Sequence, residues 1–459
     1  MPTIQFFLQH CAPALLPLAF SGLAFAAELS GSTMGRKPLM RDFMGINFHT
    51  FQVEDPALYA QAVKLARDYH PYAWDIQGDT SVDPPFPSTR QKIKGDTETI
   101  DWSQIYGGWV NEGMRVDACL TAFDWVRDHE GFKDFPKDVE RYGKVFAQTF
   151  GPGGPHPVVE AVEMENEPGS WPTDRYVELF TALATGIRAG NPKMKIATCT
   201  MSAETPDQWE KPIQAIEGLE ALYDVINMHT YSFAKGGGWP GFERTYPEAP
   251  GIRYLQTVDA MLAYRQAHPA MHDKELWVTE FGYDAATPEA LKTADPKWIP
   301  STDQQQAQWL VRSFLLFAER DINRAYLYWF DDKDGNSFHG ASGITRNGTP
   351  KPAFYAVRHL QTALGAYRFD KVVTAQVGEV YAYQFVNDDK HVAWAIWSPT
   401  SGKETSKRVI PGAPGKPARA ERMAIADGKP EAVVCQVTPA GLDVNVGEDP
   451  VFVFFAAKK

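Results

Sequence analysis

Apolar and polar positions along the chain follow two different rhythms. From about residue 43 to 365, short apolar runs alternate with amphipathic stretches, which is the pattern of parallel strands that are each followed by a helix. The eight apolar runs expected to form strands are Phe43–Phe48, Tyr69–Trp74, Arg115–Thr121, Val158–Glu165, Lys195–Cys199, Asp224–His229, Leu276–Phe281 and Arg324–Trp329. The helices expected between and after them are Asp55–Ala66, Trp102–Glu112, Pro136–Thr149, Asp174–Ala189, Pro212–Ala221, Thr257–Gln266, Asp303–Glu319 and Pro352–Ala363.

This rhythm predicts an α/β fold, a (β/α)8 TIM barrel, over residues 43–365. A doubly wound open sheet is the competing fold. It usually carries a glycine-rich phosphate-binding turn after its first strand, and Ile46 to His49 contain no glycine. The barrel is therefore the favoured fold.

After about Tyr367 the pattern changes to short strands of alternating polarity. Examples are Val377–Val386, His391–Trp397 and Val451–Phe455, separated by the Pro/Gly-rich stretch Ile410–Pro417. This pattern predicts a small C-terminal β-sandwich over residues 366–459. Residues 28–42 are expected to join this domain and to add an edge strand to it.

The first residues form an apolar stretch. Residues 1–26 contain no Asp, Glu, Lys or Arg, and the stretch ends in Ala24-Phe25-Ala26. We interpret residues 1–27 as a signal peptide, cleaved after Ala26 or Ala27, although a Lys or Arg near its start is missing. An uncleaved anchor is the alternative. Cleavage would leave an exported protein, periplasmic or secreted, with no membrane span.

Composition narrows the classes of partner. With 459 residues and 44% hydrophobic content, the chain can bury a large core and a second small one. A net charge of −12 argues against nucleic acid, which needs a basic surface. The 13 tryptophans suit a carbohydrate, whose C–H groups pack on flat aromatic faces.

Cysteines and acids give no sign of a metal or cofactor. The chain that remains after cleavage has Cys119, Cys199 and Cys435, an odd number without metal-ligand spacing. We expect Cys119 and Cys199 to be buried as small apolar side chains. The acids between Asp331 and Asp334 lack the alternating spacing of a calcium loop. No metal and no cofactor are predicted.

Two segments that end in a glutamate carry the main chemical signal. Glu163 to Pro168 closes the fourth strand run, and Leu276 to Gly282 closes the seventh. Barrel strands end at the catalytic mouth, so Glu167 and Glu280 would face each other across it. Cleavage of a glycosidic bond needs one protonated and one ionised carboxyl group, about 5–5.5 Å apart in a retaining mechanism. A lone glutamate at a strand end is more often a surface or salt-bridge residue, but the pair in this register favours catalysis.

These residues resemble a known group of enzymes. Asn166-Glu167-Pro168 after the fourth strand and Thr279-Glu280-Phe281-Gly282 at the seventh are similar to the motifs of glycoside hydrolase clan A, most like family 39 and relatives such as family 5. The resemblance covers the whole predicted barrel. It implies a retaining glycoside hydrolase without a cofactor, in which Glu167 is the general acid/base and Glu280 the nucleophile.

The same resemblance implies further substrate-binding residues. Asn166 would bind the sugar 2-OH, and His229 and Tyr231 would line the floor of the −1 subsite, with Tyr231 donating to the nucleophile. Trp329 would form the platform under the −1 sugar. A strand cap for His229 and a core position for Trp329 are the structural alternatives.

Other candidates for sugar binding lie at predicted loops. Trp74 and Asp75 follow the second predicted strand, and a structural role is equally open for both. His49 follows the first strand, and Trp239 lies in the long loop at 232–253. Loops of this length exceed what a connection needs.

Glu165 departs from the family pattern. Family 39 sequences commonly read Trp-Glu-x-Trp-Asn-Glu-Pro here, whereas this chain has Val162 and Glu165 at the two aromatic positions. An ionised Glu165 near Glu167 would raise its pKa, which suits an acid catalyst; pairing with an Arg or Lys is the alternative.

Three other functions share these features. A transglycosidase uses the same residues and differs only in the acceptor of the second step. A non-catalytic carbohydrate-binding barrel would keep the cleft without turnover, and in a surface-assembly protein the sandwich would be the working part. The sequence does not select among sugars, linkages or oligomeric states.

Overall fold

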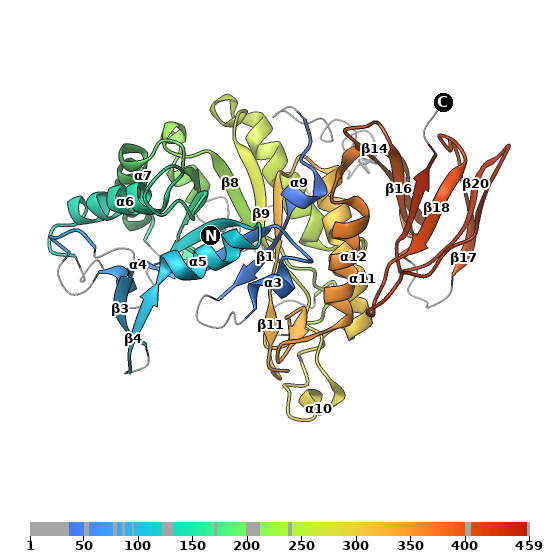
Figure 1. Ribbon diagram of the computed structural model, residues 1–459, viewed down its shortest axis with the longest axis horizontal. Coiled ribbons are helices and arrows are strands. Elements are labelled where there is room, and N and C mark those ends of the chain that lie inside the picture. Colours follow the sequence, from blue (N-terminus) through green and yellow to red (C-terminus); the bar gives the residue numbers. More distant parts are fainter. Residues whose placement is uncertain are drawn as a thin grey trace, which may run out of the picture.

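The computed structural model describes residues 36–49, 55–76, 80–84, 88–93, 96–121, 132–168, 172–198, 212–236, 241–399 and 405–456. The predicted signal peptide, Cys199 and Trp239 lie outside the described residues. Figure 1 shows two units side by side, a mixed helix–strand unit on the left and antiparallel sheets on the right. Among the described residues, no helix is both long and apolar enough to cross a membrane.

The larger unit is a closed barrel of eight parallel strands, in the order β1-β10-β9-β8-β7-β6-β5-β2. Its strands are β1 Met44–Phe48, β2 Leu65–Pro71, β5 Arg115–Thr121, β6 Ala161–Met164, β7 Lys195–Ala197, β8 Val225–His229, β9 Glu275–Phe281 and β10 Arg324–Leu327. The predicted TIM barrel is thus confirmed. Seven of its strands overlap the expected runs closely, and the exception is β2.

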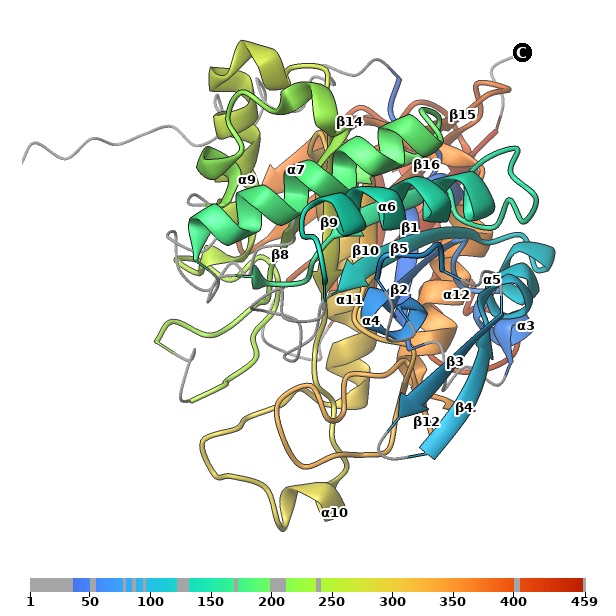
Figure 2. The same cartoon turned by 90° about the vertical axis from the view of Figure 1, so that its left-hand side faces the viewer.

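Helices surround the barrel (Figures 1 and 2). The longer ones are α5 Trp102–Asn111, α6 Lys137–Phe150, α7 Thr173–Gly190, α9 Arg253–Ala267, α11 Asp303–Glu319 and α12 Pro352–Leu364. The short ones are α2 Met40–Phe43, α3 Pro56–Tyr59, α4 Tyr72–Asp75, α10 Pro288–Leu291, η3 Glu220–Leu222 and η4 Pro269–Met271. A hairpin of β3 Ser88–Ile93 and β4 Asp96–Asp101 projects between α4 and α5.

Helix α11 has a start signal in the sequence. Thr302 and Gln305 form a reciprocal capping box, in which each side chain bonds the backbone of the other. Every residue from Gln306 to Glu319 is buried, because the helix lies between the barrel and the C-terminal sheets (Figure 1). A helix covered all round lacks the polar face of a surface helix.

The second strand is a correction. It begins at Leu65 and not at Tyr69, and the helix expected over Asp55–Ala66 ends at Tyr59. The prediction started the strand too late because of Arg67. A charged side chain inside an apolar run indicates a surface position unless it is paired. Consequently Trp74 lies in α4 and not at a strand end.

The barrel interior changes character along its axis. Near the amino ends of the strands it is filled by an apolar cluster that includes Trp277 and Tyr326. Gly45 makes room for this layer, because a Cβ there would lie 2.4 Å from Cδ1 of Tyr326. Nearer the carboxyl ends the interior holds buried charges, and these form the site described below.

The C-terminal unit is a sandwich of two antiparallel sheets, as predicted. The larger sheet has the order β14 Tyr367–Gln376, β15 Val380–Asn387, β16 Val392–Trp397, β21 Val451–Phe455 and β18 Pro417–Arg422. The smaller sheet has the order β17 Ser406–Ile410, β20 Gly441–Val446 and β19 Cys435–Thr438.

Alternation along β15 shows that the larger sheet is covered on both faces. Val380 and Ala382 pack in the cluster between the two sheets. Tyr381 and Tyr383 point to the other face and pack in the core that is continuous with the barrel. The sandwich is therefore fixed to the barrel by an apolar contact.

The N-terminal segment does not form the expected edge strand where it is described. Residues 36–39 are irregular and Met40 begins helix α2. Arg36 pairs with Asp388, and the carbonyl of Lys37 accepts a bond from Arg368 Nε at 3.0 Å. Pro38 has no N–H for a strand ladder, so side chains attach the segment to the sandwich.

Candidate active site

Glu280 lies near the carboxyl end of β9 and is only 5% exposed. Its Oε2 accepts a hydrogen bond from the Tyr231 hydroxyl at 2.7 Å. Its Oε1 accepts from Arg67 Nη1 at 2.9 Å and from the Tyr69 hydroxyl. Both oxygens are engaged by donors, which is the environment of an ionised carboxylate.

Gly282 follows Glu280 for a steric reason. A Cβ at this position would lie 2.2 Å from the carbonyl oxygen of Tyr328. The close approach lets the segment after β10 pass beside β9, where Tyr328 N donates to Phe281 O at 2.7 Å. The glycine in the Thr-Glu-Phe-Gly motif thus sets how the carboxyl ends of two neighbouring strands meet.

Arg67 is fully buried and joins five barrel strands. Besides Glu280, its donors reach Glu163 Oε2 at 2.8 Å, Asn47 Oδ1 at 2.6 Å, Asn166 Oδ1 at 2.9 Å and Cys119 Sγ at 3.3 Å. Arg67 itself belongs to β2, and its partners come from or follow β1, β5, β6 and β9. A guanidinium held by its planar fork in this way fixes the position of the Glu280 carboxylate.

A further buried acid near Arg67 and Glu163 is Asp117. Burial raises the pKa of Asp117 well above its usual range, and the charge of Glu163 raises it further. A neutral Asp117 adds no negative charge beside Glu163, which limits repulsion between acids inside the barrel.

Glu167 follows β6 on a strained backbone. Glu165 and Glu167 have φ angles of 77° and 48°, in the left-handed region that non-glycine residues rarely adopt. Such outliers cluster at functional sites. The turn presents the Glu167 side chain to the mouth, where it is 40% exposed.

The surroundings of Glu167 differ from those of Glu280. Oε1 of Glu167 lies 2.8 Å from His229 Nδ1. Loss of surrounding water raises the pKa of Glu167, and Arg67 opposes this shift only in part. Glu167 is therefore the carboxyl group of the pair that is favoured to hold a proton.

His229 bridges the two carboxyl groups. It ends β8 and is fully buried, and burial lowers its pKa to about 4. Its Nε2 lies 3.4 Å from Glu280 Oε1. One oxygen of each glutamate and one His229 nitrogen lie within 4.8 Å of one another. This short distance between carboxyl oxygens fits the roughly 5–5.5 Å between the carboxyl groups of a retaining pair better than the roughly 6.5–9.5 Å of an inverting pair.

The same three side chains also have the donor types and spacing of a metal site. The Arg67 guanidinium, 2.9 Å from Glu280, would repel a cation there. Both Glu280 oxygens already accept protein donors. We therefore continue to predict that the site binds no metal.

Aromatic rings line one side of the mouth. Trp329 follows β10 and is half-buried. The ring of His49, which follows β1, meets it edge-on with centroids 4.6 Å apart, and Tyr69 lies 5.0 Å from His49. Burial, and then the charge of Arg67, lower the pKa of His49 to about 4. His49 is thus a neutral ring beside Trp329.

A second wall lies behind Tyr231. The Arg244 guanidinium lies 5.2 Å from the Tyr231 ring centroid and its Nε donates to Asp284 at 2.8 Å. His339 meets Tyr231 edge-on at 4.8 Å, and its backbone N–H donates to Asp284 at 2.6 Å. The loops that carry these residues hold Tyr231 against Glu280.

Six predicted residues are brought together here. They are Glu167, Glu280, Asn166, His229, Tyr231 and Trp329, with His49 beside Trp329. Their roles toward a substrate stay predictions. Trp239 lies outside the described residues.

Trp74 and Asp75 do not belong to this group, which corrects their expected place at the mouth. Asp75 is fully buried and accepts from Trp102 Nε1 at 2.8 Å and the Tyr142 hydroxyl at 2.7 Å. Trp74 is buried in the core and stacks on Trp102. Because β2 ends at Pro71, helix α4 turns both side chains into the core.

Glu165 does not set the pKa of Glu167, contrary to one expectation. It is buried, and its Oε2 accepts a long bond from the N–H of Asn166 at 3.4 Å. Its charge acts on Tyr72, whose pKa is raised first by burial and then by Glu165. The raised pKa of Glu167 instead comes from loss of water.

Two residues of the site, Arg67 and Tyr69, escaped the sequence prediction. The available signal was the alternation Leu65, Arg67, Tyr69 on one face of β2. An arginine at a barrel-facing position needs a buried acid as partner, and Glu163, two residues before the motif's Glu165, could have been that acid.

Comparisons with known proteins agree on the fold. No family model and no curated protein matches the chain. A family 39 glycoside hydrolase from Bacteroides cellulosilyticus is 15% identical with a TM-score of 0.64, covering 92% of this chain and 82% of that one. The family 51 arabinofuranosidase from Xanthomonas axonopodis pv. citri is 15% identical with a TM-score of 0.60, covering 92% and 97%.

A third similar structure is the catalytic domain of family 30 xylanase C from Talaromyces cellulolyticus. It is 13% identical with a TM-score of 0.57, and the match covers 91% of this chain and 97% of that one. At these identities the likeness is one of fold. The barrel with its sandwich is thus a fold that these three glycoside hydrolases share with this chain.

Proposed function

We propose that the chain is a retaining glycoside hydrolase, with Glu280 as nucleophile and Glu167 as general acid/base. One observation carries the proposal: two carboxyl groups with oxygens within 4.8 Å of each other have opposite surroundings. Glu280 accepts donors on both oxygens, whereas partial loss of surrounding water raises the pKa of Glu167. Double displacement needs this separation and these two states of protonation.

In the first step an oxygen of Glu280 attacks the anomeric carbon, and the bond from that carbon to the leaving oxygen breaks. Glu167 gives its proton to the leaving oxygen, so that an alcohol departs. A glycosyl ester on Glu280 remains.

In the second step water attacks the anomeric carbon of the ester. Glu167, now a carboxylate, takes a proton from that water, and the bond between the sugar and Glu280 breaks. Two inversions at one carbon give a product with the anomeric configuration of the substrate.

Arg67, Tyr69 and Tyr231 position the nucleophile. Their three bonds to Glu280 fix its carboxylate before substrate arrives. Such fixed geometry lowers the activation free energy, because the entropy cost of aligning the reacting atoms has already been met. In this account they are positioning residues.

His229 holds the acid without competing for its proton. A pKa near 4 leaves its ring neutral at higher pH, so Nδ1 can accept from protonated Glu167. The Nε2–H of this tautomer then faces Glu280 at 3.4 Å. We assign this tautomer from the surrounding groups.

The proposed substrate is an oligo- or polysaccharide. Asn166 would bond the sugar 2-OH, and Trp329 would lie under the −1 sugar, as the resemblance implies. We further propose that residues 1–27 are removed and that the enzyme acts in the periplasm or outside the cell.

The test is hydrolysis of a panel of aryl glycosides by the full chain. Because structures of similar fold include an arabinofuranosidase and a xylanase, the panel begins with xylosides and arabinofuranosides in both anomeric forms. Proton NMR of the first-formed product is expected to show the substrate's own anomer. Release of the opposite anomer would contradict the retaining mechanism.

Azide distinguishes the two glutamates. With Glu280→Ala, azide is expected to replace the nucleophile directly and give a glycosyl azide of inverted configuration. With Glu167→Ala, azide should attack the glycosyl ester and give the retained azide. The reverse pattern would exchange the two roles.

A further inference from the structure

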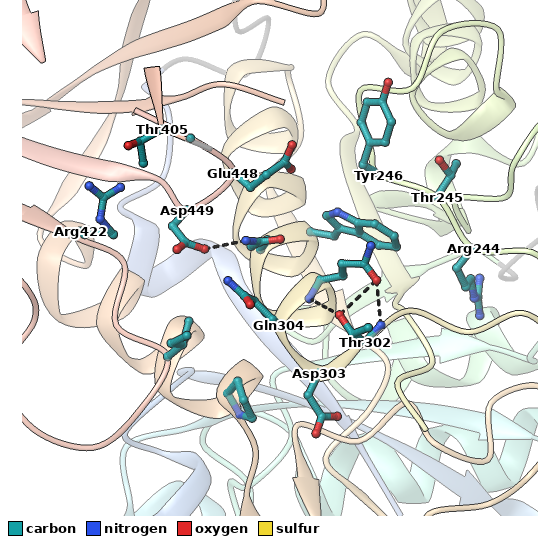
Figure 3. Close-up of a pocket in the computed structure, with 16 residues that line it drawn as sticks. Arg244, Thr245, Tyr246, Thr302, Asp303, Gln304, Thr405, Arg422, Glu448 and Asp449 are labelled. Atoms are coloured by element: carbon teal, nitrogen blue, oxygen red, sulfur yellow. Dashed lines mark hydrogen bonds between the residues drawn. The ribbon is translucent and has the colours of Figure 1, made fainter. Parts of the chain in front are cut away.

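A second cavity lies between the barrel and the sandwich. Its volume is about 750 Å³, within the range of small-molecule sites. Figure 3 shows Glu448, Asp449 and Arg422 of the sandwich on one side, Gln304 on α11 facing them, and Tyr246 on the far side. The cavity shares Arg244 with the wall behind Tyr231, but none of the residues that bind Glu167 or Glu280 lines it.

The lining combines aromatic faces with hydrogen-bonding side chains. Trp309 and Tyr246 contribute rings, and Gln304, Gln308 and Asp449 contribute amide and carboxylate groups. Sugars present both kinds of surface, because their ring C–H groups pack on aromatic faces and their hydroxyls pair with amides and carboxylates.

Part of this lining is held in place and part is free to bind. Gln308 Nε2 donates to Asp449 Oδ1 at 2.7 Å, and Arg312 pairs with Glu448. The Gln304 side chain is exposed and makes no hydrogen bond to any described residue. The hydroxyl of Tyr246 has no partner in the described part of the chain either. The cleft thus has some side chains held by protein contacts and others that keep donors and acceptors for a ligand.

The charges in the cleft favour a neutral ligand. Arg312 pairs with Glu448 and also with Glu248, and burial raises the pKa of Glu448. Arg346 pairs with Asp303 at 3.0 Å. Arg422 is already paired with Glu431 at 3.1 Å. An anion would meet the Asp449 carboxylate, whereas a cation would meet Asp303 paired with arginine and Glu448 favoured in its neutral form.

We propose that this cleft is a binding site for a neutral oligosaccharide, separate from the catalytic mouth. The apolar rings and the unused Gln304 and Tyr246 groups carry this assignment. It does not depend on turnover, since binding in the cleft involves neither Glu167 nor Glu280.

Calorimetry on the full chain carrying Glu280→Gln tests the proposal, with cellotetraose, xylotetraose and mannotetraose as probes. Sorbitol serves as a polyol control. The background is compared with the same chain carrying Gln304→Ala and Tyr246→Phe. The matched control is Gln104→Ala, which removes another exposed glutamine from the first turn of a helix, α5.

At least one tetrasaccharide is expected to bind at two sites, and sorbitol at none. The double cleft variant should weaken one of the two sites about tenfold, as two lost hydrogen bonds allow. Gln104→Ala should change neither site. In the chain with Glu280 intact, the cleft variant should leave kcat on any aryl glycoside that is hydrolysed unchanged.

Equal binding by the parent and the double cleft variant would overturn the proposal, as would the absence of binding by every probe at millimolar concentration. Failure of the proposed enzyme function would give a different experimental result. It would appear as no hydrolysis of any glycoside, while the cleft site would still be seen by calorimetry.

Discussion

The two sides of the barrel mouth each present a glutamate, but the surroundings of the two glutamates differ. On the β9 side, Glu280 is buried and tied to Arg67 and two tyrosines. On the β6 side, Glu167 is exposed toward the mouth, sits on a strained turn and contacts neutral His229. The comparison teaches that environment, and not residue type, divides the roles of nucleophile and acid.

Removing the carboxylate on the buried side should have the largest effect. Glu280→Gln is expected to lower kcat about 10⁴-fold or more for every leaving group, because no ester can form. Glu275→Gln is the matched control, since Glu275 lies in the same strand and pairs with Lys195. Steady-state kinetics check both, and an active Glu280→Gln enzyme would break the comparison.

Removing the acid on the exposed side should depend on the leaving group. Glu167→Gln is expected to cost about 10²–10⁴-fold with poor leaving groups and far less with dinitrophenol, which departs without a proton. The wild type should lose kcat/KM as pH rises through the raised pKa of Glu167. This basic limb should vanish in the variant, and its persistence would assign the acid elsewhere.

Variants of two buried arginines distinguish an effect on the position of the nucleophile from an effect on protein stability. Arg67 pairs with Glu163 and Glu280 in the mouth, and Arg312 pairs with Glu248 and Glu448 between barrel and sandwich. Arg67→Lys is expected to lower kcat about 10²-fold through a misplaced nucleophile. Arg312→Lys should lower Tm and leave kcat unchanged. Equal kinetic effects of the two variants would argue against a positioning role.

Loss of one tyrosine should have a smaller effect. Tyr231→Phe removes a single hydrogen bond to the Glu280 carboxylate. Such a bond to a charged group contributes about 1.5–3 kcal/mol, so kcat should fall about 10- to 100-fold with little change in KM. A rise in KM at constant kcat would instead indicate a role in ground-state binding.

The neutral histidines of the mouth predict how stability depends on pH. Burial lowers the pKa of His49 and His229 to about 4, whereas both take up protons near pH 6.5 in the unfolded chain. Stability should therefore be full above pH 6.5 and fall as pH drops toward 4, by up to about 1.4 kcal/mol per pH unit for each proton. Urea unfolding of wild type and His229→Asn should show a smaller slope in the variant. Equal slopes would contradict a buried neutral His229.

Much of the fold could be predicted because its signals are local. Helix α11 spans the residues expected from its sequence, since Thr302 and Gln305 mark its start. Strand β9 is largely apolar, with Glu280 as its penultimate residue and Gly282 directly after its end. Apolar rhythm, caps and turns identify such elements without knowledge of their partners.

The missed parts depend on contacts between distant strands. Arg67 is acceptable inside β2 only because Glu163 lies beside it in the closed barrel. Because the prediction placed β2 too late in the sequence, it also assigned Trp74 and Asp75 to the mouth, whereas both lie in the core. The expected effect of Glu165 on the pKa of Glu167 was wrong for a similar reason, because residue propensities do not predict the left-handed backbone at Glu165 and Glu167.

Trapping of the covalent intermediate tests the central claim most directly. The 2-deoxy-2-fluoro analogue of whichever glycoside the panel identifies, with a dinitrophenyl leaving group, should form the ester rapidly and hydrolyse it slowly. Peptide mass spectrometry is expected to find one added sugar on the peptide that contains Glu280, and none in Glu280→Gln. A sugar on any other residue, or turnover without a trapped ester, would contradict the assignment of Glu280 as the nucleophile.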